Sequence, residues 1–166
     1  MSLLQVRDLR VEFKTPDGIV KAVAGVTFDL KAGETVAIVG ESGSGKSVSN
    51  LAYMGLLPAS KTSISGSVIL KTDDGEVELI GLDNDRLRKI RGKDIAMIFQ
   101  DPMSALHPYY TIGDQLIEAH QVHNDVDKSV SRDRAIELLG LVGVADPADR
   151  LKAYPHQFSG GMRQRV

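Results

Sequence analysis

The residues best suited to chemistry lie in one glycine-rich run, GESGSGKS, at positions 40–47. The run fits the pattern G-x-x-x-x-G-K-[ST], in which glycines let successive backbone N–H groups turn inward around phosphate oxygens. Lys46 can reach the β- and γ-phosphates of a nucleotide, and Ser47 can offer a hydroxyl to Mg²⁺. A helix starting at Lys46 would add the positive end of its dipole. The predicted phosphate site comprises Gly40, Glu41, Ser42, Gly43, Ser44, Gly45, Lys46 and Ser47.

Two later segments carry polar groups that mean little in isolation. The stretch FSGGMRQRV at 158–166 can open a helix whose first N–H groups face an anion, although Ser159 also fits an ordinary serine N-cap. Gln100 follows an apolar run and precedes Asp101-Pro102, and a glutamine in that place is commonly a surface residue. Their order along the chain, after a phosphate-binding pattern, makes the functional interpretation the stronger one.

In this order the three motifs resemble those of ATP-binding cassette (ABC) ATPases, and the resemblance covers essentially the whole chain. It makes residues 40–47 the Walker A loop and Gln100 the Q-loop glutamine, which helps to bind Mg²⁺ and the attacking water. It also implies ATP and Mg²⁺ as cofactors. Residues 158–164 would be the signature motif, which contacts the γ-phosphate of ATP held by a partner subunit. That motif is formed by Phe158, Ser159, Gly160, Gly161, Met162, Arg163 and Gln164.

Three stretches narrow the resemblance to the importers of oligopeptides and dipeptides, a group that includes nickel importers. They are QDPMSALHP at 100–108, YPHQF at 154–158, and Met162 in place of the usual signature glutamine. The resemblance implies a second ABC ATPase subunit, identical or different, and membrane permease subunits that contact the Q-loop region. A solute-binding protein outside the cytoplasm would take part indirectly. The chain itself would lie on the cytoplasmic face of the membrane as a peripheral subunit.

The resemblance also implies that several catalytic elements of the family are not among residues 1–166. The family's Walker B strand, catalytic glutamate and switch histidine follow the signature motif, so no residue of 1–166 is assigned as the catalytic glutamate. We therefore expect this chain alone to hydrolyse ATP poorly or not at all. We also expect it to be marginally stable or self-associating, because the family's core sheet needs that strand. The alternatives are a non-catalytic nucleotide-binding fragment and an ABC ATPase that is not a transporter.

Several other residues invite weaker interpretations. Phe13 is the nearest aromatic candidate for stacking on adenine, but a core position in its strand is slightly favoured. Asp83 begins a pattern that hints at a calcium loop, and a helix N-cap explains it better. His120 and His123 lie three apart without an evident third metal ligand. The basic residues at 86, 88, 89, 91 and 93 predict a solvated face rather than a nucleic-acid site, and no nucleic-acid partner is expected.

The elements that must position these residues follow from hydrophobic spacing and turn signals. Strands are predicted near 6–13, 20–23 and 26–30, with turns at 15–18 and 31–34. A hairpin is predicted around Asp73-Asp74-Gly75. The run 35–39 is rich in β-branched residues and is predicted to be a strand buried on both faces, as in a parallel sheet, and 94–99 is predicted to be another buried strand. Helices are predicted at 46–57 and 83–91, and the chain after Pro108 reads as mostly helical.

The predicted fold is α/β: an incomplete P-loop NTPase core of the RecA-like ABC ATPase type, with an N-terminal antiparallel β subdomain and a partial helical subdomain. The β subdomain would take residues 1–33 and 65–82, the core 34–64 and 83–101, and the helical subdomain 102–166. The 166 residues have a net charge of -2, which gives no general attraction to nucleic acid or anionic membranes. The absence of cysteine excludes disulfides and is consistent with a cytosolic setting.

Overall fold

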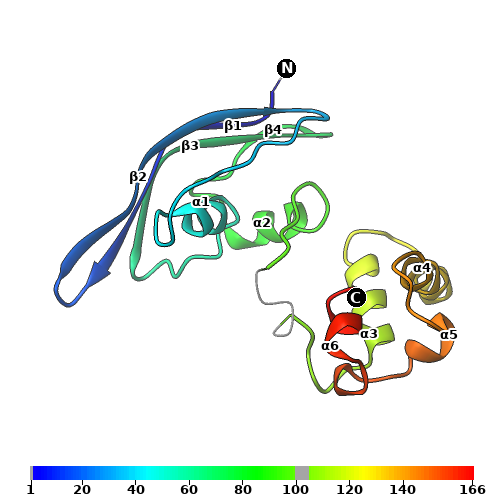
Figure 1. Cartoon of the computed structure of the whole chain (residues 1–166). Helices are drawn as coiled ribbons and strands as arrows, with labels where there is room; N and C mark the ends of the chain where they lie inside the picture. The colour runs from blue at the N-terminus through cyan, green and yellow to red at the C-terminus, as the bar shows by residue number, and fades with distance from the viewer. Residues whose placement is uncertain (1, 100–104) are drawn as a thin grey trace. The chain divides into compact units, whose positions relative to one another are not determined.

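The computed structural model describes residues 2–99 and 105–166, and the chain forms two compact units, residues 1–94 and 95–166 (Figure 1). The first unit contains a curved antiparallel sheet and two short helices, and the second is helical. The expectation of an antiparallel β subdomain and a partial helical subdomain is therefore met. The finer division of the chain into three subdomains stays a prediction.

The sheet has four antiparallel strands in the order β2-β1-β3-β4. They are β1 (Ser2–Thr15), β2 (Gly18–Lys31), β3 (Thr62–Thr72) and β4 (Gly75–Glu78). The two strands predicted at 20–23 and 26–30 are one continuous strand, β2. The predicted hairpin around Asp73 is present, with Thr72 paired to Gly75. The irregular step in the apolar spacing of β1 corresponds to a register shift near Asp8, whose φ is 45°.

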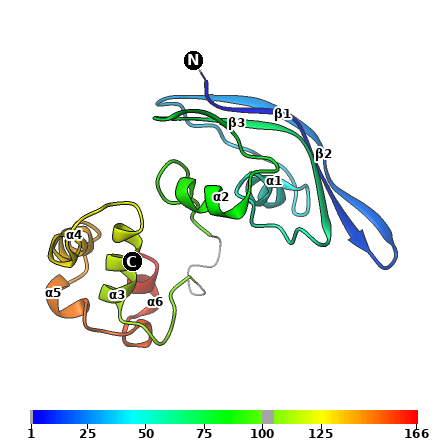
Figure 2. The ribbon, with the colours of Figure 1, turned by 180° about the vertical axis from the view of Figure 1, so that it is seen from behind.

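Two helices, α1 (Lys46–Tyr53) and α2 (Asn84–Ile90), lie on the same face of this sheet (Figures 1 and 2). The contact between α1 and the sheet is apolar, with Ala52 packed against Val11 and Val23. The helix ends at Tyr53, four residues before the predicted end at Leu57. Gly55 has a left-handed φ of 62°, and Leu56 N donates to Leu51 O at 2.9 Å, which closes the last turn in a Schellman arrangement.

The parallel-sheet strands predicted at 35–39 and 94–99 are not formed among the described residues. Residues 34–40 have no regular secondary structure and no ladder pairing, and among residues 94–99 Ile95 makes an isolated bridge. Val39 is 90% exposed and Ile98 is 96% exposed. A β-branched run becomes a strand only when a neighbouring strand accepts its backbone hydrogen bonds, and no parallel neighbour lies in the described parts of the chain.

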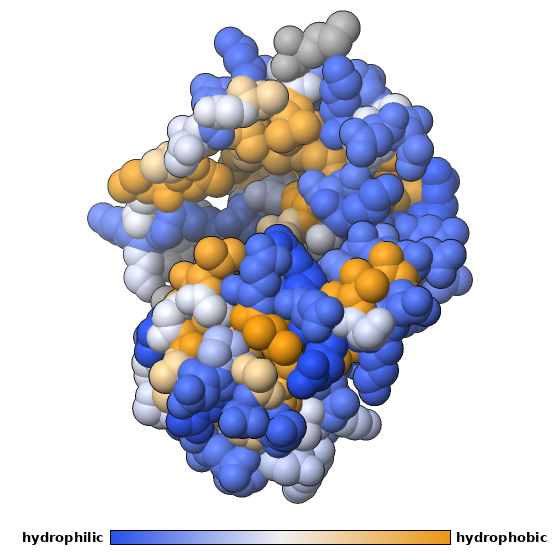
Figure 3. Space-filling view, turned by 90° about the vertical axis from the view of Figure 1, so that its right-hand side faces the viewer, coloured by the Kyte–Doolittle hydropathy of each residue, from blue (hydrophilic) through white to orange (hydrophobic). Residues whose placement is uncertain are grey.

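Exposed apolar side chains follow from these unpaired runs. On the face that Figure 3 presents, hydrophobic residues reach the surface in both units. Large hydrophobic side chains exposed to water promote association, because burial between molecules removes them from solvent. The predicted self-association is thus physically motivated, and sedimentation of the purified chain would test it.

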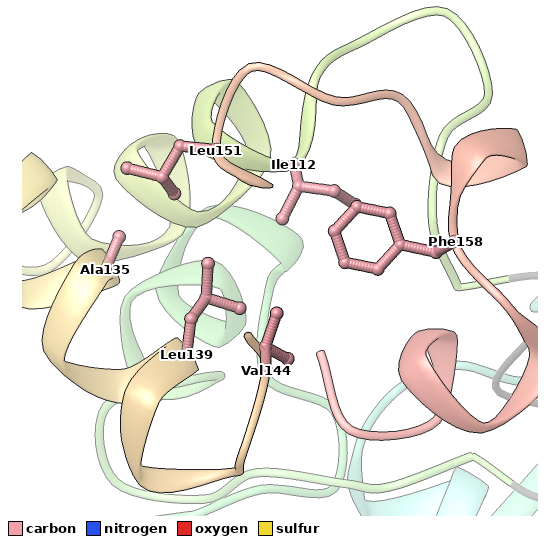
Figure 4. Packing of buried hydrophobic residues seen from close by; sticks show 6 residues of the cluster. All are labelled: Ile112, Ala135, Leu139, Val144, Leu151 and Phe158. Carbon is pink, nitrogen blue, oxygen red and sulfur yellow. The ribbon is translucent and has the colours of Figure 1, made fainter. Parts of the chain in front are cut away.

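In its described residues, the second unit packs four helices and one 3-10 turn around a small core. These elements are α3 (Ile112–Gln121), α4 (Lys128–Leu141), α5 (Pro147–Arg150), η2 (Pro155–Gln157) and α6 (Gly160–Arg163). Figure 4 shows how buried side chains from α3, α4 and the connecting segments converge. The cluster consists of Ile112, Ala135, Leu139, Val144, Leu151 and Phe158. None of the helices in the described residues is long and apolar enough to cross a membrane.

Candidate functional site

The loop 40–45 leads directly into α1, as the sequence predicted. Gly43 has a φ of 83° and Gly45 a φ of 87°, conformations that strain any residue with a Cβ. Ser44 N donates to Glu41 O at 3.2 Å and closes the turn. The residues before the helix are exposed, whereas Gly45 is buried. The glycines thus allow the backbone to bend sharply just in front of the helix.

Gly45 is held against the sheet. A Cβ placed on it would lie 2.3 Å from the carbonyl oxygen of Ala22 and 3.2 Å from Cγ2 of Val23, both in β2. Ser49, one turn into α1, donates through its buried hydroxyl to Gly45 O at 3.0 Å. The first turn of α1 is therefore positioned by backbone contact with β2, and a side chain at position 45 would push it away.

Lys46 folds its side chain back over the loop. Its Nζ donates to Gly40 O at 2.7 Å and to Glu41 O at 2.6 Å, and it lies 3.3 Å from Oγ of Ser44. A single ammonium thereby bridges the start of the loop to the start of the helix. The positive charge lies beside the backbone groups that the sequence assigns to phosphate binding.

The N-terminus of α1 has the polarity that an anion requires. Within the described residues, no side chain caps this helix, and its first turn contains no acidic residue. The N–H groups of the first turn have no partner inside the helix, and they add to the positive charge of Lys46. Ser47 is exposed in this turn. These residues fit a polyphosphate, and the Ser47 hydroxyl fits a hard cation such as Mg²⁺.

The signature segment is built from a buried anchor and an exposed turn. Phe158 is buried in the core of the helical unit, and Arg150 lies over its ring at 6.0 Å. Ser159 caps α6, with its Oγ accepting from Met162 N at 3.3 Å. Gly160 and Gly161 are exposed, and a Cβ on either would meet nothing. The turn therefore presents its backbone outward from a fixed base.

Arg165 ties this turn to the end of α4. Its Nε donates to Gly161 O at 3.1 Å and its Nη1 donates to Gly143 O at 2.8 Å. Met162 packs against the same core as Phe158, while Gln164 is exposed and Arg163 is partly buried. The contact of this motif with a nucleotide stays a prediction.

Gln100 and Phe13 are the two remaining residues that were predicted to belong to the site. Gln100 lies outside the described residues, so its role as a Q-loop and Mg²⁺ residue stays a prediction. Phe13 lies in β1 and packs against the cluster formed by Val11, Val23 and Ala52. That packing favours the core interpretation of Phe13 over adenine stacking.

The Asp83 carboxylate accepts from Arg86 N at 2.9 Å, as an N-cap does. The described residues hold no group of three metal ligands.

Sequence reasoning missed one residue of this region. Arg91 was expected on a solvated basic face, but its guanidinium donates to carbonyl groups at the C-terminal end of α1. The expectation was wrong for Arg91 because charge spacing cannot show that a residue 37 positions away presents its carbonyl. An arginine just after a short helix was the available signal, since such a residue can reach the free carbonyls of a neighbouring helix.

The chain is similar to known proteins both in sequence and in fold. The family model described as "ABC transporter" matches residues 23–166. The dipeptide transport ATP-binding protein DppD of Bacillus subtilis is 52% identical over 99% of this chain, which covers 48% of that protein. The oligopeptide transport ATP-binding protein OppD of Haemophilus influenzae is 50% identical, with 99% of this chain matched to 49% of its length. The chain thus spans about half the length of these relatives.

A solved structure is similar over nearly the whole chain. It is the dimeric structure of MJ0796, described as a bacterial ABC transporter cassette, with a TM-score of 0.77 and 28% identity. The match covers 98% of this chain and 66% of MJ0796. The same cassette in a post-hydrolysis state bound to ADP and Pi has a TM-score of 0.76 and 27% identity, again over 98% and 66% of the two chains.

Proposed function

The chain belongs to the ABC transporter family, and on that premise we propose that it forms a nucleotide-binding part of the ATPase subunit of an importer. Residues 40–47 hold the phosphates of ATP through backbone N–H groups and Lys46. The observation that carries the proposal is the position of the Lys46 ammonium, 2.7 Å from Gly40 O, beside a helix N-terminus that bears no acidic residue in its first turn. The positive charge of Lys46 and the N–H groups of the first turn of α1 therefore lie together at the proposed phosphate site.

Mg²⁺ would be held by the Ser47 hydroxyl together with phosphate oxygens, and Gln100 would complete its coordination. Bound there, the ion would supply positive charge that offsets the charge of the phosphate tail. The chain's own part is to orient the phosphate tail: the glycines allow close approach and Lys46 balances the negative charge. Adenine stacking on Phe13 is not supported, because that ring packs against the core cluster of the first unit.

Peptides are the proposed class of transported solute. The support is the identity of 52% to a dipeptide transport protein and 50% to an oligopeptide transport protein. By the same reasoning, the chain works as a peripheral subunit on the cytoplasmic face of the membrane, beside permease subunits. Ser159, Gly160 and Gly161 would face the ATP of a second ATPase subunit, in line with the dimeric form of the solved cassette.

The chain by itself is proposed to bind ATP better than it hydrolyses it. Hydrolysis needs a carboxylate that positions water beside the γ-phosphate, and no residue of this chain is assigned that role. Phosphate release by the purified chain should match the release by the Lys46→Ala variant. Turnover that depends on Lys46 would show that the chain contains the missing carboxylate after all.

Calorimetric titration with Mg-ATP tests the nucleotide proposal. We expect saturable binding by the chain and a large loss of affinity in Lys46→Ala, because a charged hydrogen-bond donor is removed from the phosphates. Lys61→Ala is the matched control: it removes one exposed lysine from the same unit and should bind as the unchanged chain does. Equal affinities of Lys46→Ala and Lys61→Ala would refute the proposal.

A further inference from the structure

Arg91 holds the rear end of the helix whose front end forms the phosphate site. Arg91 follows α2, and its side chain crosses to the two residues that directly follow α1, the C-cap Met54 and Gly55. Its Nε donates to Met54 O at 2.7 Å and its Nη2 donates to Gly55 O at 3.0 Å. Asn84, at the start of α2, lies with its Oδ1 3.4 Å from Nη1 of the same guanidinium. One side chain therefore links two helices that are remote in sequence.

The contact satisfies a specific need of α1. The last carbonyl groups of a helix have no partner inside it and carry partial negative charge. The last turn of α1 contains no basic residue of its own. A guanidinium is planar and carries several donors in a fixed fork, so it can serve two neighbouring carbonyls at once. Arg91 thus supplies the capping charge that α1 lacks.

The packing around this contact is close at Gly55. A Cβ on Gly55 would lie 2.6 Å from Cδ1 of Leu87 and 2.9 Å from Nη2 of Arg91. Leu87 and Met54 are both buried at this joint. The glycine therefore permits α2 and Arg91 to approach the end of α1 closely, and the buried leucine maintains that approach.

We propose that Arg91 is a positioning residue of the phosphate site, acting through α1. The helix has eight residues, so it is a rigid rod of about 12 Å. Its front is fixed where Gly45 meets Ala22 of β2, and its rear is held by the packing of Ala52 on the sheet and by the two hydrogen bonds from Arg91. Two fixed ends determine where the N–H groups of the first turn point and where Lys46 begins. Release of the rear end lets the rod tilt, and displacements of about 1 Å are enough to impair a preorganised site.

This inference rests on the proposed nucleotide binding by residues 40–47, and calorimetry separates the two. Wild-type, Arg91→Ala, Arg91→Lys and Arg88→Ala chains are titrated with Mg-ATP, with Lys46→Ala as the reference for loss of the site. A misfolded fraction lowers the number of sites titrated, whereas a tilted helix lowers affinity at unchanged stoichiometry. Arg88 is an exposed arginine of α2 and provides the matched control.

We expect Arg91→Ala to weaken Mg-ATP binding by about tenfold at unchanged stoichiometry, as the loss of an outer-shell partner does at metal sites. Arg91→Lys should give a smaller loss of affinity, because it keeps the charge but not the forked donor geometry of arginine. Arg88→Ala should bind as the wild type does.

Wild-type affinity in both Arg91 variants, or a fall in stoichiometry alone, overturns the inference. If Arg91→Ala does not fold, wild-type affinity in Arg91→Lys overturns it. Failure of the wild type to bind Mg-ATP, or binding unaffected by Lys46→Ala, refutes the nucleotide proposal and this inference with it.

Discussion

Gly45 lies so close to Ala22 that a Cβ on the glycine would be 2.3 Å from the alanine carbonyl oxygen. The contact joins the first residue before α1 to the middle of β2, and the obstructing atom belongs to the backbone. It cannot move aside as the end of a flexible side chain would. The spacing of the phosphate loop from the sheet therefore depends on one missing methyl group.

Substitution of this glycine should be far more damaging than substitution of its neighbour in the loop. Gly45→Ala combines a left-handed φ of 87° with the collision at Ala22, so we expect it to reduce the free energy of unfolding by at least about 2 kcal/mol more than Gly43→Ala does. Gly43→Ala has the φ penalty alone, about 1 kcal/mol, since a Cβ there meets nothing. Urea denaturation of the two variants measures both, and equal losses would show that the close contact with β2 is not what matters.

Glu78 gives the first unit a dependence on pH. Partial burial by itself would raise the pKa of Glu78, but hydrogen bonds from Ser67, from Val68 N at 2.8 Å and from Ile80 N at 3.0 Å outweigh it and lower the pKa. A lowered pKa in the folded state stabilises the fold at pH values above the unfolded value of about 4.5. The stabilisation should disappear as the pH falls through the lower, folded pKa.

Glu78→Gln should therefore be less stable than the unchanged chain at pH 7, with the difference shrinking below about pH 4.5. Urea denaturation between pH 3 and pH 7 would follow both proteins. Glu76→Gln is the control, because this exposed glutamate lies on the same strand, β4. A constant difference between Glu78→Gln and the unchanged chain across this pH range would contradict the explanation.

Two leucines of α4 provide a test of the core beneath the signature segment. Leu139 is 2% exposed and packs in the cluster that includes Phe158, whereas Leu141 is 72% exposed. Leu139→Ala should reduce the stability of the helical unit by about 2–5 kcal/mol, since it removes buried methyl groups and leaves a cavity. Leu141→Ala should change it by less than about 0.5 kcal/mol. Thermal unfolding followed by circular dichroism would compare them, and similar losses would place the core elsewhere.

Local signals in the sequence predicted the antiparallel sheet well. The turn at 15–18, the hairpin at Asp73 and the N-cap at Asp83 depend on residues within a few positions of each other, and local chemistry determines them. The register shift near Asp8 coincides with a break in the apolar spacing of β1, although no bulge was predicted there. These features are recoverable because each turn type accepts few residues.

Features that depend on remote partners could not be predicted in the same way. The runs 35–39 and 94–99 have the composition of buried strands, yet composition does not supply the neighbouring strand that would accept their hydrogen bonds. The contact of Arg91 with Met54 and Gly55 likewise requires the packing of α2 on α1, which no periodicity reveals. For the phosphate site, the pattern at 40–47 predicted the loop, while the close approach of Gly45 to β2 appeared only in three dimensions.

Amide chemical shifts of the isotopically labelled chain test the central claim most directly. On addition of Mg-ATP we expect the largest changes at the backbone N–H groups of residues 43–48, where free helix donors and Lys46 converge, and we expect these changes to vanish in Lys46→Ala. Shifts confined to other parts of the chain, or unchanged by the loss of Lys46, would contradict a phosphate site at the front of α1.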